Sequence, residues 1–507
     1  MDLLLYIKYF MSIASLVLIG YVPVYFFLLR KKILDLEYKN LSGKFFIAFL
    51  CFYIGSFLVT IFMIALSLFG LELRFEYMLM FTIFFSCLSF YLYFSKRFNY
   101  REKLRLKRMI KGSVTLEDNL KIKKGKVVTG SRRSRFSLSL GRLSLGTVLF
   151  MILALLTLGS FIIVVFFTFL FPIRFWDAIA CWSLKAKAFF IDSDIFTYYT
   201  QHGYDFSHNS YPLYLSLLQC WIYTWIGRVD ENLVKIIFPL FYLSGLFVLY
   251  HFFRKKLNQL LSMLLVFVFS VLPVIADHGY IEYTNLLFSV VLVLAVYFLY
   301  LYRVKKKIGS YLLLSAVFFA LLANIRSEGA LFMAVFLLVS VIFTFIDVIR
   351  LKHKGRAVLN FLYAVLLSAA LVAPFWLLKY GLGLPVLSIE WQQAIGGSST
   401  LNLAEAARVM TGQVLFSAYD STRAFLGSGY GPAWAVLLVL FWVNVKRLFV
   451  RANWVPFIFL FLGLITVFFS IALIPDFAGS VERYLLHIFP LAYLWILSNL
   501  PNSKRLG

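Results

Sequence analysis

Long apolar runs recur along the whole chain, and they constrain its fold more than any other feature of the sequence. The chain has 507 residues, of which 62% are hydrophobic and only 14% are charged. Apolar runs of about 17–25 residues are long enough to cross the hydrocarbon core of a bilayer as helices. The alternating pattern of a transmembrane barrel is not seen. The sequence therefore predicts an all-α polytopic membrane protein with about 13 transmembrane helices.

Each predicted span is an apolar run bounded by polar or charged residues. The first run is too long and apolar for a cleavable signal peptide and ends in the basic triplet 30–32, so it is taken as a span. The predicted spans lie near residues 5–29, 44–70, 75–94, 146–172, 234–253, 258–276, 285–302, 310–325, 330–347, 357–378, 431–445, 453–474 and 484–500.

The formal net charge of +26 is concentrated in loops. Half of it falls in the segment 95–145, which holds 16 Lys and Arg against 3 Asp and Glu. Basic residues in short loops mark the cytoplasmic side of membrane proteins, and placing the N-terminus outside puts every basic loop on that side. Membrane lipids are therefore expected partners, and no nucleic acid is expected.

This orientation divides the chain into three parts. Residues 1–94 form a predicted N-terminal accessory transmembrane bundle, residues 95–145 a basic cytoplasmic loop, and residues 146–507 the main transmembrane module. The run 211–227 is apolar enough to span, but counting it would put the basic triplet 254–256 outside. We therefore predict a helix at the outer surface there, with interfacial aromatic residues, and a full span is the alternative.

The first predicted outer loop, within 171–221, holds an acid among lysines and aromatic residues. Such an acid at a membrane surface is more often functional than decorative, because its desolvation is costly. If residues 175–190 form a helix, Asp177 and Lys185 lie on one face about 12 Å apart along its axis. Asp177 could then accept a proton, while Lys185 and Lys187 contact an anion. The alternative is an anchor helix with snorkelling lysines.

A second polar cluster lies in the short loop between two predicted spans. Asp277, His278 and Glu282 are plausible ligands for a divalent metal ion, and with Tyr280 they could also hold sugar hydroxyls. The spacing is not diagnostic of a metal site, so a polar cap between helices is the alternative. A divalent metal is thus a candidate cofactor of unknown site, and no P-loop, Rossmann or zinc-type pattern points to another.

Two arginines lie on the predicted outer side, where the positive-inside bias disfavours them. Arg326 and Arg483 can each make bidentate contacts with a phosphate, because the guanidinium group is planar and always charged. Pairing with the neighbouring Glu328 or Glu482 is the alternative.

Several short segments resemble the GT-C superfamily of membrane glycosyltransferases, most closely its bacterial members related to the protein O-mannosyltransferases and the aminoarabinose transferases. The resemblance covers roughly residues 146–500, and its first-loop part is the most specific. The segments that carry it are 176–178 (WDA), 185–187 (KAK), 208–213 (HNSYPL), 279–282 (GYIE) and 483–486 (RYLL).

The resemblance implies a GT-C fold for the module 146–507, with surface helices in its first large extracytoplasmic loop. It implies a glycosyltransferase on the extracytoplasmic side of a bacterial inner (plasma) membrane, with a polyprenyl-phosphate-linked sugar donor and a glycan, lipid or protein acceptor. Asp177 would be the base of an inverting displacement. The donor phosphate would contact Lys185, Lys187, Arg326 and Arg483, and the substrates would contact Trp176, His208, Tyr211, Asp277, His278, Tyr280 and Glu282.

Two other functions would use the same location. A transporter or flippase for a lipid-linked sugar would place ionisable residues near the bilayer midplane or in broken helices. Here the polar residues gather in the outer loops instead, which favours chemistry at the surface. An oligosaccharide polymerase or ligase would share the outer location and the lipid donor.

Overall fold

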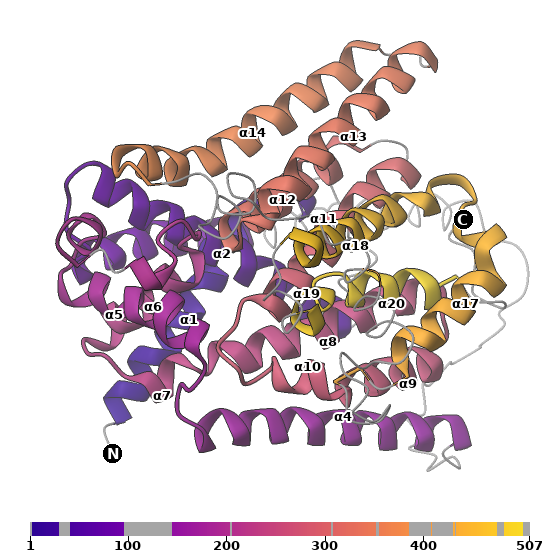
Figure 1. Cartoon of the computed structure of the whole chain (residues 1–507), viewed down its shortest axis with the longest axis horizontal. Coiled ribbons are helices and arrows are strands. Elements are labelled where there is room, and N and C mark those ends of the chain that lie inside the picture. Colours follow the sequence, from indigo (N-terminus) through magenta and orange to yellow (C-terminus); the bar gives the residue numbers. More distant parts are fainter. Residues whose placement is uncertain are drawn as a thin grey trace, which may run out of the picture.

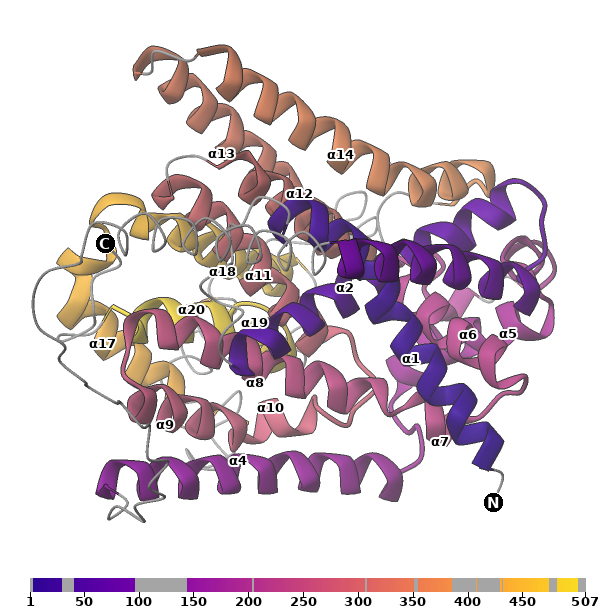
Figure 2. The same cartoon turned by 180° about the vertical axis from the view of Figure 1, so that it is seen from behind.

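The structure, a computed structural model, describes residues 3–29, 41–95, 144–202, 205–305, 308–350, 354–384, 407, 429–430, 432–473 and 481–499. Within these ranges every regular element is a helix, and no strand occurs. Figures 1 and 2, which view the molecule from opposite sides, show the helices packed into one bundle. The predicted all-α class is therefore confirmed.

Eight helices among the described residues are long and apolar enough to cross a membrane. The chain is thus an α-helical protein of the polytopic membrane class. These helices are α1 (Leu3–Val24) continued by η1 (Tyr25–Leu29), α2 (Leu41–Leu68), the helix Phe75–Ser95, α4 (Leu145–Leu170), α7 (Glu231–Val234) with α8 (Ile237–Lys256), α11 (Asn285–Val304), α13 (Glu328–Arg350) and α14 (Lys354–Gly381).

The other five predicted spans coincide with shorter helices. The last is broken by a turn at 486–488, and the nine residues of its main helix rise only about 14 Å, which is less than the thickness of a bilayer core. The shorter helices are α9 (Gln259–Ser270) with α10 (Pro273–Asp277), α12 (Gly309–Ile325), α17 (Ala433–Leu448), α18 (Val455–Leu473), and α19 (Val481–Leu485) with α20 (Phe489–Leu497).

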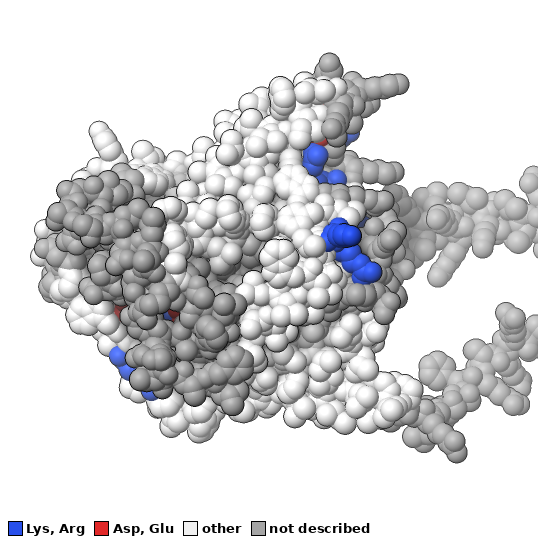
Figure 3. Space-filling view, turned by 45° about the vertical axis from the view of Figure 1, so that its right-hand side comes forward, with Lys and Arg blue, Asp and Glu red and all other residues white. Residues whose placement is uncertain are grey.

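The core and the lipid-facing surface are distinguished by which helices bury their apolar residues. Almost every residue of α11 is buried, and this helix contacts α8, α12, α18 and α20. The helices α4 and α14 lie along opposite edges of the bundle (Figure 1). On α4, Leu155 and Phe166 expose more than half of their surface, as expected for side chains that face lipid. In the space-filling view of Figure 3, most of the visible surface of the described residues is uncharged.

The first two helices approach each other very closely. A Cβ atom built on Gly20 would collide with the backbone of Cys51, and one built on Gly55 would collide with the backbone of Leu16. Small residues that let two backbones meet are a common means of packing helices in membranes. Both glycines are therefore required by the α1–α2 contact.

Hydroxyl groups join these N-terminal helices to the rest of the chain. The Tyr53 hydroxyl bonds Ser244 of α8, and Ser56 bonds the Tyr214 hydroxyl at 2.6 Å. The backbone N–H of Leu73, in the turn after α2, donates to the Ser193 carbonyl at 2.7 Å. The predicted accessory bundle thus contacts the main module directly.

The contacts between loops sort the bundle into two ends. At the end that we call the site end, the Lys379 ammonium donates to the Ser210 carbonyl and α19 contacts the first outer loop. At the opposite end, called the basic end, Lys256 donates to Asn499 at 2.9 Å and Arg303 to Asp347 at 3.0 Å. These groupings match the loop alternation that the positive-inside rule predicted.

Two local predictions hold only in part. The run 211–227 forms α6 (Tyr214–Ile226), whose 13 residues are all buried and pack on α1, α2 and α5 (Leu184–Ile191). It rises only about 20 Å, so it is a helix too short to span a bilayer, as predicted. Its aromatic side chains are covered by protein, so the prediction that they lie at the lipid interface is wrong. The predicted helix 175–190 begins instead as the π-helix η2 (Asp177–Ser183), which changes the spacing of its faces before α5 starts.

Candidate functional site

An ion pair between the first outer loop and the C-terminal part of the chain lies at the centre of the candidate site. Arg483 Nη1 donates to Asp177 Oδ2 at 2.9 Å, across 306 residues of sequence. Their side chains remain 31% and 36% exposed, so both are within reach of a ligand. The guanidinium carbon of Arg483 also lies 5.0 Å from the centre of the Tyr283 ring.

Arg483 is positioned through the backbone of its own short helix. The side-chain amide of Asn285, the first residue of α11, donates to the Arg483 carbonyl at 2.9 Å. Next to it, Glu482 accepts a bond from the Gly429 backbone N–H at 2.6 Å, and its carbonyl accepts one from the Tyr430 hydroxyl. The carboxylate that binds Arg483 is therefore Asp177, a partner that the sequence did not suggest, and Glu482 anchors α19 through Gly429 and Tyr430.

Arg326 forms a second and more deeply buried cluster. It lies directly after α12, and its Nε and Nη2 atoms donate to both carboxylate oxygens of Glu328 at 3.3 and 3.1 Å. Its other bonds go to Thr284 at 3.2 Å and to the Tyr484 hydroxyl at 3.1 Å. The alternative pairing with Glu328 is thus confirmed, and it is bidentate.

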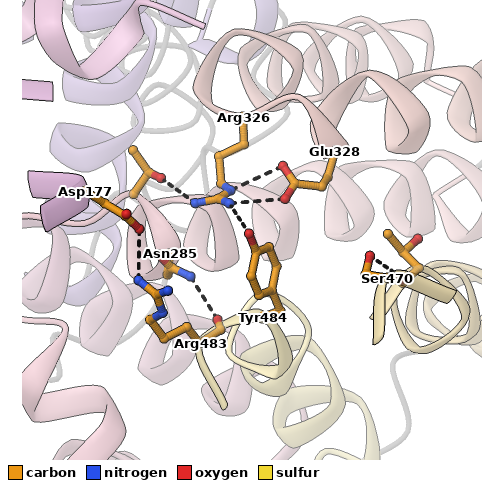
Figure 4. A network of polar contacts seen from close by, with 9 residues as sticks. Asp177, Asn285, Arg326, Glu328, Ser470, Arg483 and Tyr484 are labelled. Carbon is orange, nitrogen blue, oxygen red and sulfur yellow. Dashed lines mark hydrogen bonds and ion pairs between the residues drawn. The ribbon is translucent and has the colours of Figure 1, made fainter. Parts of the chain in front are cut away.

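The two arginine clusters are adjacent because α19 contributes to both. Figure 4 shows Arg483 directed at Asp177 and the next residue, Tyr484, directed at Arg326. The site therefore combines η2, the start of α11, the junction of α12 with α13, and α19. Its residues come from four separate stretches of the chain that meet at the site end.

The two predicted phosphate-binding lysines serve the loop around them in this structure. Lys185 is fully buried and donates to the His208 carbonyl at 2.9 Å. Burial, together with the charge of nearby Lys379, lowers the pKa of its ammonium group to about 7. Lys187 is partly exposed and pairs with Glu231 at the start of α7. A role for either lysine toward a phosphate stays a prediction.

The predicted substrate-binding residues of the first loop lie beside the cluster. His208 adopts a left-handed backbone with φ of 49°, which is uncommon for a residue other than glycine, and its ring stacks on Tyr211 at 4.8 Å. Tyr211 in turn lies close enough to Arg326 to contribute to raising the pKa of its guanidinium group. Trp176 is 61% exposed and its ring lies 5.9 Å from that of Phe206.

The loop 277–283 is internally bonded. The Tyr280 hydroxyl donates to Asp277 at 2.8 Å, and His278 Nδ1 shares a 2.9 Å bond with the Val274 carbonyl. Burial lowers the pKa of His278 to about 4 and raises that of Glu282 to about 7. Within the described ranges, no group of three His, Cys, Asp or Glu is arranged to hold a metal ion. A divalent metal thus stays a prediction.

The sequence did not assign a role to several residues that the structure places here. Tyr484 and Thr284 bind Arg326, and Asn285 binds the backbone of Arg483. Tyr484 and Glu328 also line a pocket with His487, whose buried Nε2 atom has no hydrogen-bond partner among the described residues. The only available signal was that Tyr484 directly follows a predicted site arginine.

Comparisons with known proteins do not extend this description. No protein-family model, curated protein or solved structure gives a significant match to the chain.

Proposed function

We propose that this protein is a membrane glycosyltransferase of the GT-C type, which transfers a sugar from a polyprenyl-phosphate donor to an acceptor hydroxyl on the extracytoplasmic face of a bacterial inner membrane. One observation carries the proposal: a partly exposed carboxylate, Asp177, is bonded at 2.9 Å to an equally exposed arginine, Arg483. This reaction requires a base that takes the proton of the acceptor hydroxyl and a cation that stabilises the leaving phosphate.

The donor phosphate replaces Asp177 as the partner of Arg483 in this proposal. A guanidinium group binds two oxygens of a phosphate through parallel N–H bonds, and Arg483 keeps 31% of its side chain exposed for that contact. Its main chain is held by Asn285, so the exchange requires only a side-chain movement. The exchange leaves the Asp177 carboxylate oxygen available to the acceptor.

The acceptor hydroxyl then donates its proton to Asp177 as its oxygen bonds to the anomeric carbon. The bond between that carbon and the phosphate oxygen breaks, and its electron pair stays on the phosphate. The products are the glycosylated acceptor and polyprenyl phosphate, with inversion at the anomeric carbon. Arg483 is placed to stabilise the negative charge that builds on the phosphate in the transition state.

In the proposal Arg326 has a structural role next to the reaction centre. Its bidentate bond to Glu328 and its bond to the Tyr484 hydroxyl fix the residue next to Arg483. Lys185 fixes the first outer loop by donating a hydrogen bond to the His208 carbonyl. These groups hold Asp177 and Arg483 in position, and Arg483 is the main contact of the phosphate.

The position of the cluster favours transfer over transport. Asp177 begins η2, Arg326 directly follows α12 and Arg483 belongs to the five-residue helix α19, so none of them lies in the middle of a long helix. A transport pathway for a charged lipid headgroup is expected to place ionisable residues nearer the midplane. A lipid-linked sugar transporter and an oligosaccharide polymerase or ligase are therefore the functions that the assay must separate.

The test uses purified full-length protein in detergent and labelled polyprenyl-monophosphate sugars, and it measures the release of polyprenyl phosphate. We expect release by the unaltered protein, and a decrease of about 100-fold in kcat/KM for Arg483→Gln, since one stabilising donor is lost. Arg74→Gln is the matched control, because Arg74 forms an exposed ion pair with Glu72 in the turn that contacts the same outer loop.

Three results would overturn the proposal. The first is no release with any monosaccharide donor. The second is elongation of a diphosphate-linked glycan instead, which would indicate a polymerase or ligase. The third is movement of the donor across a vesicle membrane without release, which would indicate a flippase.

A further inference from the structure

A pocket at the basic end lies far from the candidate site. It is formed where the ends of α8, α11 and α20 meet the residues that precede α18. On α11, Tyr300 lines this pocket and Asn285 belongs to the site end. The helical rise puts these two residues about 22 Å apart, so the pocket is separate from the proposed reaction centre.

The rim of the pocket is polar and positively charged. Lys255 and Lys256, the last residues of α8, both line it. The Lys256 ammonium donates to the Asn499 side-chain oxygen at 2.9 Å, and the Asn453 amide donates to the same oxygen at 3.1 Å. The Lys256 ammonium and the Asn453 amide therefore converge on one oxygen, which an anion could replace as their acceptor, and Lys255 lines the same pocket.

The wall of the pocket is apolar and follows the helices toward the bilayer interior. Val293 and Val296 contribute from α11, and Leu491 and Leu494 contribute from α20. Tyr297 and Tyr300 also line the pocket, and the Lys256 ammonium lies 5.5 Å from the Tyr300 ring centre. A cationic rim above an apolar wall matches a ligand with an anionic head and a hydrocarbon chain.

We propose that this pocket binds an anionic phospholipid, with the headgroup phosphate on Lys255 and Lys256 and an acyl chain along the wall of valines and leucines. Charge complementarity favours this occupant over segments of the chain itself. The segment 95–145 holds 16 Lys and Arg against 3 Asp and Glu, and the last residues include Lys504 and Arg505. Segments of the same sign as the rim would be repelled from it.

The test measures lipid binding to purified full-length protein in neutral detergent by native mass spectrometry. Phosphatidylglycerol is titrated against phosphatidylcholine, and inorganic phosphate is titrated in a separate arm. We expect phosphatidylglycerol to bind more tightly than phosphatidylcholine. In Lys255→Gln/Lys256→Gln this affinity falls by about 20-fold, because each lysine near a lipid headgroup contributes several-fold.

The matched control is Lys305→Gln/Lys446→Gln. Both residues are exposed near the same end and neither lines the pocket, so the control removes equal charge. We expect its affinity for phosphatidylglycerol to stay within about threefold of the unaltered protein. An equal loss in the control would overturn the proposal, because attraction would then be unspecific.

A wall variant separates a lipid from a free anion. Val296→Phe fills the apolar wall and leaves the rim unchanged. It is expected to weaken phosphatidylglycerol binding at least tenfold, and it carries the test if the double lysine variant does not fold. Binding of inorganic phosphate at the lysines without preference for phosphatidylglycerol would overturn the proposal. So would phosphatidylglycerol binding that Val296→Phe does not change.

Discussion

The two ends of the bundle each contain a buried arginine bonded to a carboxylate. At the site end Arg326 binds Glu328, with side chains 9% and 17% exposed, and at the basic end Arg303 binds Asp347, with 17% and 0%. Both guanidinium groups also lie over aromatic rings, at 5.1 and 4.2 Å. Burial and pairing alone therefore do not distinguish a candidate site from a structural contact.

The difference between the ends is what lies next to each buried pair. Beside Arg326 is a second ion pair, Asp177 with Arg483, whose side chains are about one third exposed. Arg483 directly precedes Tyr484, which binds Arg326. A buried pair fixes the backbone, whereas a partly exposed neighbour can exchange its partner for a ligand. The comparison predicts that stability depends on both ends and activity on only one.

The largest expected effect is on activity. Asp177→Asn should reduce sugar transfer by 100-fold to 10,000-fold, because the amide cannot accept the proton of the acceptor. The matched control is Glu72→Gln, which removes an exposed carboxylate of the turn after α2. Transfer at the normal rate by a folded Asp177→Asn protein would exclude Asp177 as the base.

The next effect is on stability and concerns both buried pairs. Glu328→Ala and Asp347→Ala should each lower the free energy of unfolding by about 3–5 kcal/mol, because each leaves an arginine without its buried counter-charge. Unfolding in a denaturing detergent measures this loss. Transfer per folded molecule should fall only in Glu328→Ala, and an equal fall in Asp347→Ala would remove the distinction between the ends.

A smaller effect depends on pH and concerns Glu282. Burial raises the pKa of this carboxyl group from 4.5 to about 7, while Lys235 and Arg174 act in the opposite direction. Between these two values the folded protein binds the extra proton, so the contribution of Glu282 to stability falls as the pH rises.

Glu282→Gln removes this dependence. Relative to the unaltered protein, the variant should gain stability between pH 4.5 and 7, by at most about 1.4 kcal/mol per pH unit. Thermal unfolding of both proteins across this range measures the difference. The lowered pKa of His278 affects both proteins equally and cancels in the comparison. Parallel curves would show that Glu282 is charged in the folded state.

The smallest effect concerns the exposed pair of Lys187 with Glu231, whose side chains are 32% and 42% exposed. Glu231→Gln should lower the free energy of unfolding by less than about 1 kcal/mol, because water screens such a pair. A loss comparable to that of Glu328→Ala would show that exposure is a poor guide to the importance of these contacts.

The sequence predicted the helical class and the grouping of loops into two ends, because hydropathy and loop charge depend on local composition. It also marked Asp177 and Arg483 separately as candidate residues. It could not predict that they bind each other, since 306 residues separate them and only the packing of α19 against η2 brings them together.

Two other features depend on packing rather than on composition. The residues of α6 are as apolar as those of a lipid-exposed helix, and hydropathy does not tell whether lipid or protein covers them. The turn at 486–488 interrupts an otherwise continuous apolar run. The hydropathy that located the long spans therefore did not reveal the burial of α6 or the break in the last apolar run.

The bonds from α2 to later parts of the chain also set an order for the assembly of the protein. Tyr53 and Ser56 are synthesised 191 and 158 residues before their partners Ser244 and Tyr214. Until α8 has been inserted, the Tyr53 hydroxyl lacks its partner Ser244 in the apolar interior. The α1–α2 hairpin, closed by Gly20 and Gly55, can form at once. The polar bonds between α2 and the main module can therefore form only after α6 and α8 have been synthesised.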